Sequence, residues 1–322
     1  MAVSLAGRTA VVTGAGRGLG RAEALELAAL GAHVVVNDYG QPGRDGSGPA
    51  SGTPAETVVA EIRAAGGQAT AHTGDVADFA QARDLIRLAV GIGGGTLDIL
   101  VNNAGILRDR MVFSMTEDEW DAVVRVHLKG HFNTTRFAAA HWRERSKAEG
   151  RAVYGRIVNT SSEAFLAGSA GQPNYAAAKG GIVGLTTSTA GALRKYGVTV
   201  NAICPRARTR MTEDVFTDVP EEGAPDALDP GHVAPLVGYL ASPAAAGVNG
   251  QVFVVHGGMV AVMQRPLVAA RFDARGVAEL EAALTPYFAG RPLGETFAAP
   301  EVLGLKAAQA PLPAEESAGD GA

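Results

Sequence analysis

Residues 13–20 read Thr-Gly-Ala-Gly-Arg-Gly-Leu-Gly, with glycines at positions 14, 16, 18 and 20. They follow a short apolar run at 9–12, which is typical of a strand, and precede a helical pattern from Leu19 to Leu30 that Gly31 can end. Glycine lets a backbone turn tightly and approach a phosphate closely, and the start of a helix offers unpaired N–H groups to an anion. An ordinary strand-to-helix turn also tolerates glycine, but the strand-turn-helix context favours a dinucleotide site.

Strand and helix patterns alternate along the rest of the chain. Further apolar runs lie at 33–36, 97–101, 156–159, 198–203 and 251–255. Thr116, with Glu119 three residues later, is typical of a capping box that opens a helix running towards Trp142. Because the apolar runs are continuous rather than alternating, we expect strands that are buried on both faces. The pattern predicts an α/β fold: a single doubly wound parallel sheet of the Rossmann type, with helices on both faces.

Composition excludes several classes of protein. The chain has 322 residues, of which 47% are hydrophobic and 19% charged, as in a globular protein rather than a disordered or fibrous one. Its net charge of −5 argues against nucleic acid as the main partner. The single cysteine, Cys204, excludes an intrachain disulfide and a cysteine-based zinc site, and no metal site is predicted. No apolar run reaches the ~18 residues of a membrane span and no secretory signal opens the chain, so we expect a cytoplasmic protein without membrane attachment.

Three segments interrupt the regular pattern. We predict a long mobile loop at 39–54 and a lid at 212–231, which is acidic and contains prolines. The Rossmann domain is expected to span residues 1–261, followed by a C-terminal extension at 262–305 and a disordered tail at 306–322. The extension is expected to pack on the core or on a neighbouring subunit, and the side chains that favour this are Phe272, Leu280, Leu284, Tyr287 and Phe288.

Asp38 follows the second apolar run, 18 residues after Gly20. A carboxylate at this point can accept hydrogen bonds from the adenosine ribose hydroxyls and repels a 2′-phosphate. The sequence therefore predicts NAD rather than NADP as the cofactor. Arg17 and Arg44 could offset the repulsion, and a turn at the end of a strand would also suit an aspartate.

Ser162, Tyr175 and Lys179 carry the predicted chemistry. The Tyr175-Ala-Ala-Ala-Lys179 motif places two ionisable side chains on one helical face, and Ser162 precedes the tyrosine by 13 residues. A phenol with a pKa of about 10 is a poor base near neutral pH, so we expect the ammonium of Lys179 to lower the pKa of Tyr175. Ser162 is expected to stabilise charge on a substrate oxygen. A lone tyrosine is usually a packed aromatic side chain; the combination favours proton transfer.

These motifs, together with Asn102-Asn-Ala-Gly105 and Pro205, resemble the short-chain dehydrogenase/reductase family over residues 5–260. The resemblance implies that Lys179 also holds the nicotinamide ribose. The full set of cofactor-binding residues that it implies is Gly14, Arg17, Gly18, Leu19 and Gly20 at the phosphate turn, Asp38, Asp75 and Val76 at the adenosine, Asn103, Ala104 and Gly105 beside its ribose, and Tyr175, Lys179 and Pro205.

His127 stands where the family usually has an asparagine. In the family, the main-chain carbonyl of that residue is thought to hold a water in a proton relay to the lysine. A histidine can supply the same carbonyl, so the resemblance places His127 with the catalytic residues Ser162, Tyr175 and Lys179. Whether its imidazole acts catalytically or structurally is open at this point.

Four segments resemble one branch of the family in particular, the (3R)-hydroxyacyl-CoA dehydrogenase unit of peroxisomal multifunctional enzyme type 2. They are residues 35–38, 103–110, 125–130 and 232–237. This resemblance implies an NAD-dependent oxidoreductase that interconverts a 3-hydroxyacyl-CoA and a 3-oxoacyl-CoA. Arginines 206, 208 and 210, with Arg108 or Arg110, are expected to meet the negative charges of such a substrate, although they could equally be surface side chains on loops.

Other functions remain open on these residues. The same chemistry would serve a hydroxysteroid dehydrogenase, another secondary-alcohol dehydrogenase or a 3-oxoacyl-thioester reductase. A non-catalytic nucleotide-sensing regulator is a more remote alternative, because such a protein would not need both Tyr175 and Lys179. The family resemblance also implies a homodimer or homotetramer, built through the long helices expected near 117–142 and 176–196.

Overall fold

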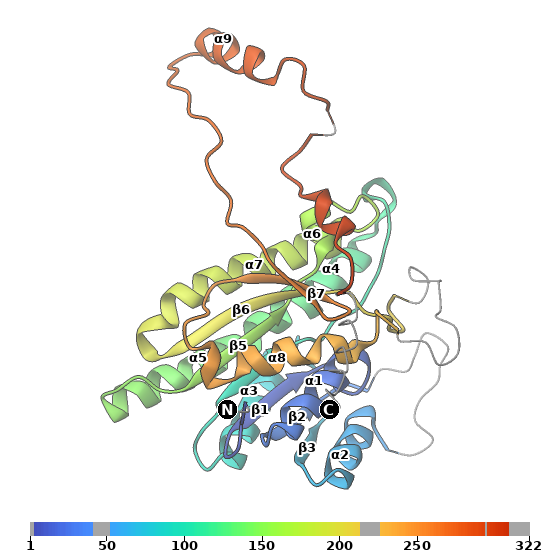
Figure 1. Cartoon of the computed structure of the whole chain (residues 1–322), viewed down its shortest axis with the longest axis vertical. Helices are drawn as coiled ribbons and strands as arrows, with labels where there is room; N and C mark the ends of the chain where they lie inside the picture. The colour runs from blue at the N-terminus through green and yellow to red at the C-terminus, as the bar shows by residue number, and fades with distance from the viewer. Residues whose placement is uncertain (1–2, 41–51, 213–225, 294, 309–322) are drawn as a thin grey trace, which may run out of the picture.

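The structure is a computed structural model that describes residues 3–40, 52–212, 226–293 and 295–308. Most of the predicted loop at 39–54, of the predicted lid at 212–231 and of the predicted tail at 306–322 lies outside the described residues. The described chain forms one layered α/β core and an extension that reaches away from it (Figure 1).

A single eight-stranded sheet runs through the core in the order β3-β2-β1-β4-β5-β6-β7-β8. The strands are β1 (Thr9–Thr13), β2 (His33–Asn37), β3 (Gln68–His72), β4 (Ile99–Asn102), β5 (Gly155–Thr160), β6 (Val198–Pro205), β7 (Val252–His256) and β8 (Met259–Val262). All neighbours pair in parallel except β7 and β8, which form an antiparallel hairpin. The predicted doubly wound parallel sheet is therefore confirmed, with one antiparallel strand added at its edge.

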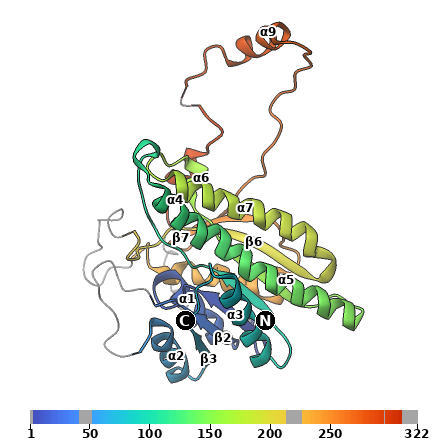
Figure 2. The same cartoon turned by 180° about the vertical axis from the view of Figure 1, so that it is seen from behind.

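Helices cover both faces of the sheet, as predicted (Figures 1 and 2). One face carries α1 (Gly18–Ala29), α2 (Pro54–Ala64) and α8 (Ala234–Ala241). The other face carries α3 (Phe79–Ile92), α5 (Gly130–Glu149) and α7 (Pro173–Leu193), with α4 (Glu117–Val124) and α6 (Glu163–Ala167) beside α7. Short 3-10 turns lie at Val112–Ser114, Arg194–Tyr196, Pro230–His232, Pro243–Ala245 and Pro300–Gly304.

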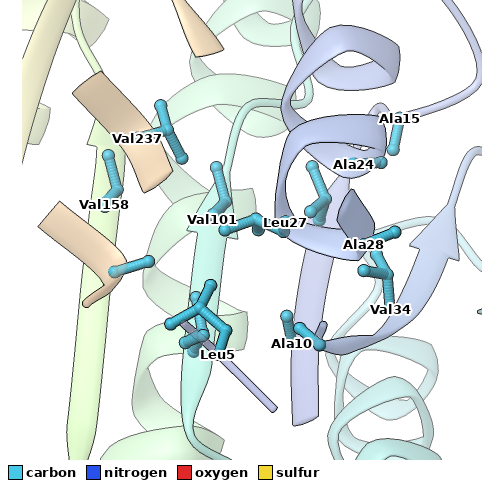
Figure 3. Packing of buried hydrophobic residues seen from close by; sticks show 14 of the residues in the cluster. Leu5, Ala10, Ala15, Ala24, Leu27, Ala28, Val34, Val101, Val158 and Val237 are labelled. Atoms are coloured by element: carbon cyan, nitrogen blue, oxygen red, sulfur yellow. The ribbon is translucent and has the colours of Figure 1, made fainter. Parts of the chain in front are cut away.

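Two apolar layers hold the helices on the sheet. On one face, Leu27 of α1 and Val237 of α8 pack over Val101 and Val158 of the central strands (Figure 3). On the other face, Trp142 of α5 is fully buried. Burial of each large apolar side chain stabilises the fold by roughly 1.5–3 kcal/mol. A strand with a continuous apolar run buries side chains on both of its faces, so such strands occupy the centre of the sheet.

The helix that begins at Thr116 has the predicted start. The Thr116 hydroxyl accepts from the backbone N–H of Glu119, and the Glu119 carboxylate accepts from the backbone N–H of Thr116. The helix does not run regularly towards Trp142, however, because a π-helical turn at Arg125–Lys129 separates α4 from α5. Such turns often mark functional sites.

The C-terminal extension leaves the core after β8 and returns to it at the 3-10 turn Pro300–Gly304. Between these points, α9 (Val277–Phe288) lies far from the sheet in both views and has no buried side chain (Figures 1 and 2). The aromatic residues of the extension contact one another: the Tyr287 ring lies 5.1 Å from that of Phe272 and 5.0 Å from that of Phe288, centroid to centroid. None of the described helices is long and apolar enough to cross a membrane.

Candidate active site

A cleft of about 800 Å³ opens at the carboxyl ends of β1 and β4. This is where the strand order of a doubly wound sheet reverses, and where such folds bind their ligands. Its walls include most of the predicted cofactor residues: Gly14, Arg17, Gly18, Leu19, Asp38, Asp75, Val76, Asn103, Ala104 and Gly105. Four predicted cofactor residues, Gly20, Tyr175, Lys179 and Pro205, are not part of these walls.

The turn after β1 requires glycine. Gly14 and Gly18 have φ angles of 63° and 53°, a conformation that other residues rarely adopt. A Cβ on Gly14 would lie 2.7 Å from the Cα of Ala104, so the turn and the segment after β4 pack backbone to backbone. The Asn103 amide donates to the carbonyls of Thr13 and Gly14 at 3.1 and 3.2 Å. Asn103 therefore braces the phosphate turn with its side chain.

Asp38 is held rigidly at the edge of the cleft. Its Oδ2 accepts from the backbone N–H of Gly16 at 3.0 Å, and its Oδ1 accepts from that of Gly40 at 2.9 Å. A Cβ on Gly16 would lie 2.7 Å from Oδ2, so glycine is also needed here. Each of these bonds takes up one acceptor position of a carboxylate oxygen. Because such an oxygen accepts more than one hydrogen bond, each oxygen can still accept another.

Asp75 has a cationic partner that the sequence did not reveal. Its Oδ2 forms an ion pair with Arg125 at 2.5 Å, and its Oδ1 accepts from the backbone N–H of Ala77 at 2.8 Å. Arg125 opens the π-helical turn and also lines the cleft. The guanidinium therefore fixes the carboxylate expected at the adenine, beside the buried Val76.

The structure brings Ser162, Tyr175 and Lys179 together next to this cleft. Ser162 caps α6 directly after β5, and its hydroxyl lies close enough to the phenol of Tyr175 to act on the pKa of that phenol. The ammonium of Lys179 lies 5.3 Å from the centroid of the Tyr175 ring and donates to the carbonyl of Thr160 at 2.6 Å. Pro205 ends β6.

The expected effect of Lys179 on Tyr175 was wrong for the protein by itself. Burial raises the pKa of Tyr175 to about 12, and the Ser162 hydroxyl opposes that rise. Lys179 does not reverse this rise: its ammonium donates to the carbonyl of Thr160, and burial lowers the pKa of Lys179 itself to about 7. At neutral pH the phenol of the protein by itself is therefore protonated.

His127 connects the cleft wall to the tyrosine. Its Nε2 lies 3.0 Å from the backbone nitrogen and 2.8 Å from the carbonyl oxygen of Ile106, which lines the cleft. Its ring meets that of Tyr175 edge-on, with the centroids 5.1 Å apart. Burial and the charge of Lys179 hold the pKa of His127 well below 6.5, so the imidazole is neutral at physiological pH.

The alternating arginines after β6 are not one anion site. Arg206 pairs with Glu163 and Arg208 with Asp226, so internal carboxylates meet two of the three guanidinium groups. The third, Arg210, lines the cleft together with Arg108. The alternation of the three arginines did not reveal these ion pairs, because Glu163 and Asp226 stand far from them in the sequence.

Sequence reasoning missed two residues of the site, Thr13 and Arg125. The Thr13 hydroxyl accepts from the backbone N–H groups of Asn103 and Ala104 at 3.0 and 3.1 Å, and so ties β1 to β4. Both residues stand inside quoted motifs, at the start of 13–20 and of 125–130, which was the available signal.

Comparison with known proteins agrees with this geometry. The family model of the short chain dehydrogenases matches residues 8–220, more than half of the chain. The chain belongs to the short-chain dehydrogenase family. It is therefore an oxidoreductase of a family that uses nicotinamide dinucleotides.

Three similar proteins cover most of this chain or a large part of it. The hydroxyacyl-CoA dehydrogenase ChsB1 of Mycobacterium tuberculosis is 55% identical over 310 residues, 93% of this chain and 94% of its own. Peroxisomal multifunctional enzyme type 2 of Mus musculus is 43% identical over 254 residues, 79% of this chain but 32% of its own. A solved short chain dehydrogenase from Mycobacterium avium has a TM-score of 0.76 and 51% identity, over 88% of this chain and 94% of its own.

The residues present fit a nicotinamide dinucleotide. The cradle at Gly14, Gly16 and Gly18 is one that any Cβ would fill or strain, and it faces the start of α1. Asp38 and Asp75 line the same cleft, where an adenosine would extend from the phosphates. In the part of the chain that the structure describes, no three His, Cys, Asp or Glu side chains gather as a metal ion would require.

Proposed function

We propose that this protein interconverts a 3-hydroxyacyl-CoA and a 3-oxoacyl-CoA with NAD as the cofactor. The observation that carries the proposal is that Ser162, Tyr175 and Lys179 gather beside His127, whose Nε2 contacts Ile106 in the wall of the cleft. The names of the similar proteins, a hydroxyacyl-CoA dehydrogenase and a peroxisomal multifunctional enzyme, support this substrate class.

Each of the three polar side chains has a distinct task in the proposed reaction. Bound NAD supplies the nicotinamide ring that accepts or gives the hydride. Tyr175 exchanges a proton with the oxygen on C3 of the substrate, and Ser162 donates a hydrogen bond to the same oxygen. Lys179, whose pKa lies at about 7, can take up and release the proton that passes through the tyrosine.

The raised pKa of Tyr175 affects the direction in which the proposed reaction runs. A phenol with a pKa of about 12 is fully protonated at pH 7 and is ready to donate its proton to a 3-oxo group. Oxidation of the 3-hydroxyl requires the phenolate, whose fraction grows about tenfold per pH unit below the pKa. We therefore expect reduction to dominate near neutral pH and oxidation to gain as the pH rises.

The preference for NAD over NADP rests on Asp38. Its carboxylate is fixed by Gly16 and Gly40 at the cleft edge, where the adenosine ribose would lie. It can accept from the ribose hydroxyls and would repel a 2′-phosphate. Arg17 is the counter-charge on the same wall, and Arg44 lies outside the described residues.

Arg108 and Arg210 are the cations proposed to meet the phosphates of coenzyme A. Both line the cleft, on segments that flank its mouth after β4 and after β6. Arg110 is engaged by Glu119 at 3.2 Å and is not assigned to the substrate.

We further propose that the chain assembles as a homodimer or homotetramer through the α4–α5 and α7 helices. The extension would pack on a neighbouring copy, because a 12-residue helix with no buried side chain, such as α9, is marginal by itself in water. Its exposed apolar side chains include Val277, Leu280 and Phe288.

The first test is NADH oxidation with acetoacetyl-CoA, using the wild type and Tyr175→Phe side by side. We expect turnover in the wild type and a loss of at least about 100-fold in the variant, because general acid catalysis contributes 10²–10⁴-fold. NADH binding, measured by fluorescence, should be retained in both. Turnover that persists in Tyr175→Phe would refute the assigned proton donor, and a wild type active on free ketones but not on CoA thioesters would refute the substrate.

A further inference from the structure

Arg206 stands at a junction of three elements that are distant in the sequence. It follows Pro205 at the end of β6, and its guanidinium forms a two-pronged ion pair with the Glu163 carboxylate, Nε to Oε2 at 2.8 Å and Nη2 to Oε1 at 2.7 Å. The same guanidinium donates to the backbone carbonyls of Val302 at 2.9 Å and Leu305 at 3.3 Å. The two charged side chains are 16% and 9% exposed, so solvent screens the pair little.

Glu163 is the first residue of α6, directly after Ser162. The helix has only five residues, and its backbone cannot hold a position by propensity alone. The Ser162 hydroxyl accepts from the backbone N–H of Ala164 at 3.1 Å, so the direction of that hydroxyl follows the first turn of α6. Whatever fixes Glu163 therefore fixes Ser162.

The segment that returns from the extension, residues 298–308, packs on the same helix. The backbone N–H of Ala299 donates to the carbonyl of Leu166 at 2.6 Å, and Val302 is only 3% exposed. The buried His256 side chain lies 3.2 Å from the Leu305 carbonyl, and the backbone N–H of Ala308 donates to Gly257 at 3.0 Å. The return segment is thus tied to both α6 and the β7–β8 turn.

We propose that Arg206, clamped by Glu163 and the return segment, is a positioning residue that sets the Ser162 hydroxyl against Tyr175. The inference rests on the proposed function in one respect, namely that Ser162 acts on the substrate oxygen. Arginine suits this task because its planar fork can hold a carboxylate and two carbonyls at once, which a lysine cannot. A displacement of about 1 Å at a reacting group can cost about 100-fold in rate.

The test uses Arg206→Lys in the full-length chain, because a lysine keeps the buried Glu163 paired with a cation. Arg208→Lys is the matched control: it makes the same change two residues away, at an arginine that pairs with Asp226 at 3.0 Å. Hydrogen exchange at the backbone amides of 164–169 should accelerate at least about fivefold in Arg206→Lys and stay within about twofold of the wild type in Arg208→Lys. Unchanged exchange in Arg206→Lys would overturn the positioning.

Kinetics then separate positioning from general loss of structure. We expect Arg206→Lys to lower kcat about 10- to 100-fold, with KM for NADH within about threefold of the wild type. In a Ser162→Ala background the same substitution should cost less than about twofold, because residues that act as one unit are not additive. A full additional loss in the double variant would show that Arg206 does not act through Ser162.

A second variant covers the case in which Arg206→Lys does not fold. Val302→Ala loosens the return segment without touching a charge, and it should show the same pattern with smaller amplitude. Faster exchange that is confined to the return segment would overturn the proposal. The exchange measurement needs no substrate, so a wild type that turns over no CoA thioester would refute the proposed function while leaving this test intact.

Discussion

Glu23 offers a sharp test of the electrostatics in this fold. The side chain lies on α1 and is fully buried, and neither of its carboxylate oxygens has a hydrogen-bond partner within the described residues. Burial raises its pKa from 4.5 to about 8, and the charge of Lys179 opposes part of that rise. In the folded protein Glu23 is therefore protonated up to about pH 8, whereas in the unfolded chain it ionises above pH 4.5.

The sign of the effect follows from proton counting. Between pH 4.5 and 8 the folded state binds more protons at Glu23 than the unfolded state does, so the free energy of unfolding falls as the pH rises. At 1.36 kcal/mol per unit, the whole rise in pKa corresponds to a loss of about 5 kcal/mol above pH 8. Between pH 6 and pH 9 the loss is about 3 kcal/mol, because only the two units from 6 to 8 contribute.

Glu23→Gln removes this titration while keeping the shape of the side chain. The free energy of unfolding of the variant minus that of the wild type should be about 3 kcal/mol larger at pH 9 than at pH 6. The assay is urea unfolding at both pH values and one protein concentration, since assembly would otherwise shift the apparent stability. Glu26→Gln, on the same helix but partly exposed, is the control and should change stability by less than about 0.5 kcal/mol. If the difference in stability between Glu23→Gln and the wild type were equal at pH 6 and pH 9, the raised pKa of the buried Glu23 carboxyl would be refuted.

Three further outcomes follow from the site and the extension. Asp38→Ala should lower kcat/KM for NAD about tenfold and raise it for NADP, as measured by steady-state kinetics with both cofactors. An unchanged ratio of kcat/KM for NAD to kcat/KM for NADP would count against the role of Asp38. Ser162→Ala removes the hydroxyl that opposes the raised pKa of Tyr175, so the rise of the oxidation rate with pH should move to higher pH, while reduction at pH 7 keeps its protonated donor. Coincident pH profiles of the variant and the wild type would contradict this. Replacing 277–288 with a Gly-Ser linker should reduce the assembled fraction seen by light scattering, and an unchanged mass at every concentration would remove α9 from the interface.

The central strands and the phosphate turn could be predicted because the signals for them are local. Continuous apolar runs identify strands that are buried on both faces, and the glycines at 14–20 mark their own turn. The edge strands escaped the same reasoning. In β3, Gln68–His72, the side chains are mostly part-exposed and the sequence has no continuous apolar run. In contrast, β8, Met259–Val262, is apolar throughout, but it is short and lies at the edge of the sheet, where exposed and half-buried positions alternate.

What could not be predicted depends on contacts between distant parts of the chain. The Tyr-x-x-x-Lys spacing places Tyr175 and Lys179 on one helical face, but their pKa values are set by burial under other elements, and the lysine is drawn to Thr160 on β5. The contacts of Arg206 could not be predicted for the same reason, because its carboxylate partner is 43 positions away and two of its carbonyl acceptors are 96 and 99 positions away.

The imidazole of His127 is best understood as a spacer. Its Nε2 is taken up by the backbone of Ile106, and its pKa lies well below 6.5, so it has neither a charge to give nor a readily titrating proton near neutral pH. The ring instead fills the space between Tyr175 and Gly105, where a Cβ would lie 2.2 Å from the His127 Cε1. Glycine at 105 is therefore required by the histidine. The two residues form one structural unit, which keeps the cleft wall at a fixed distance from the tyrosine.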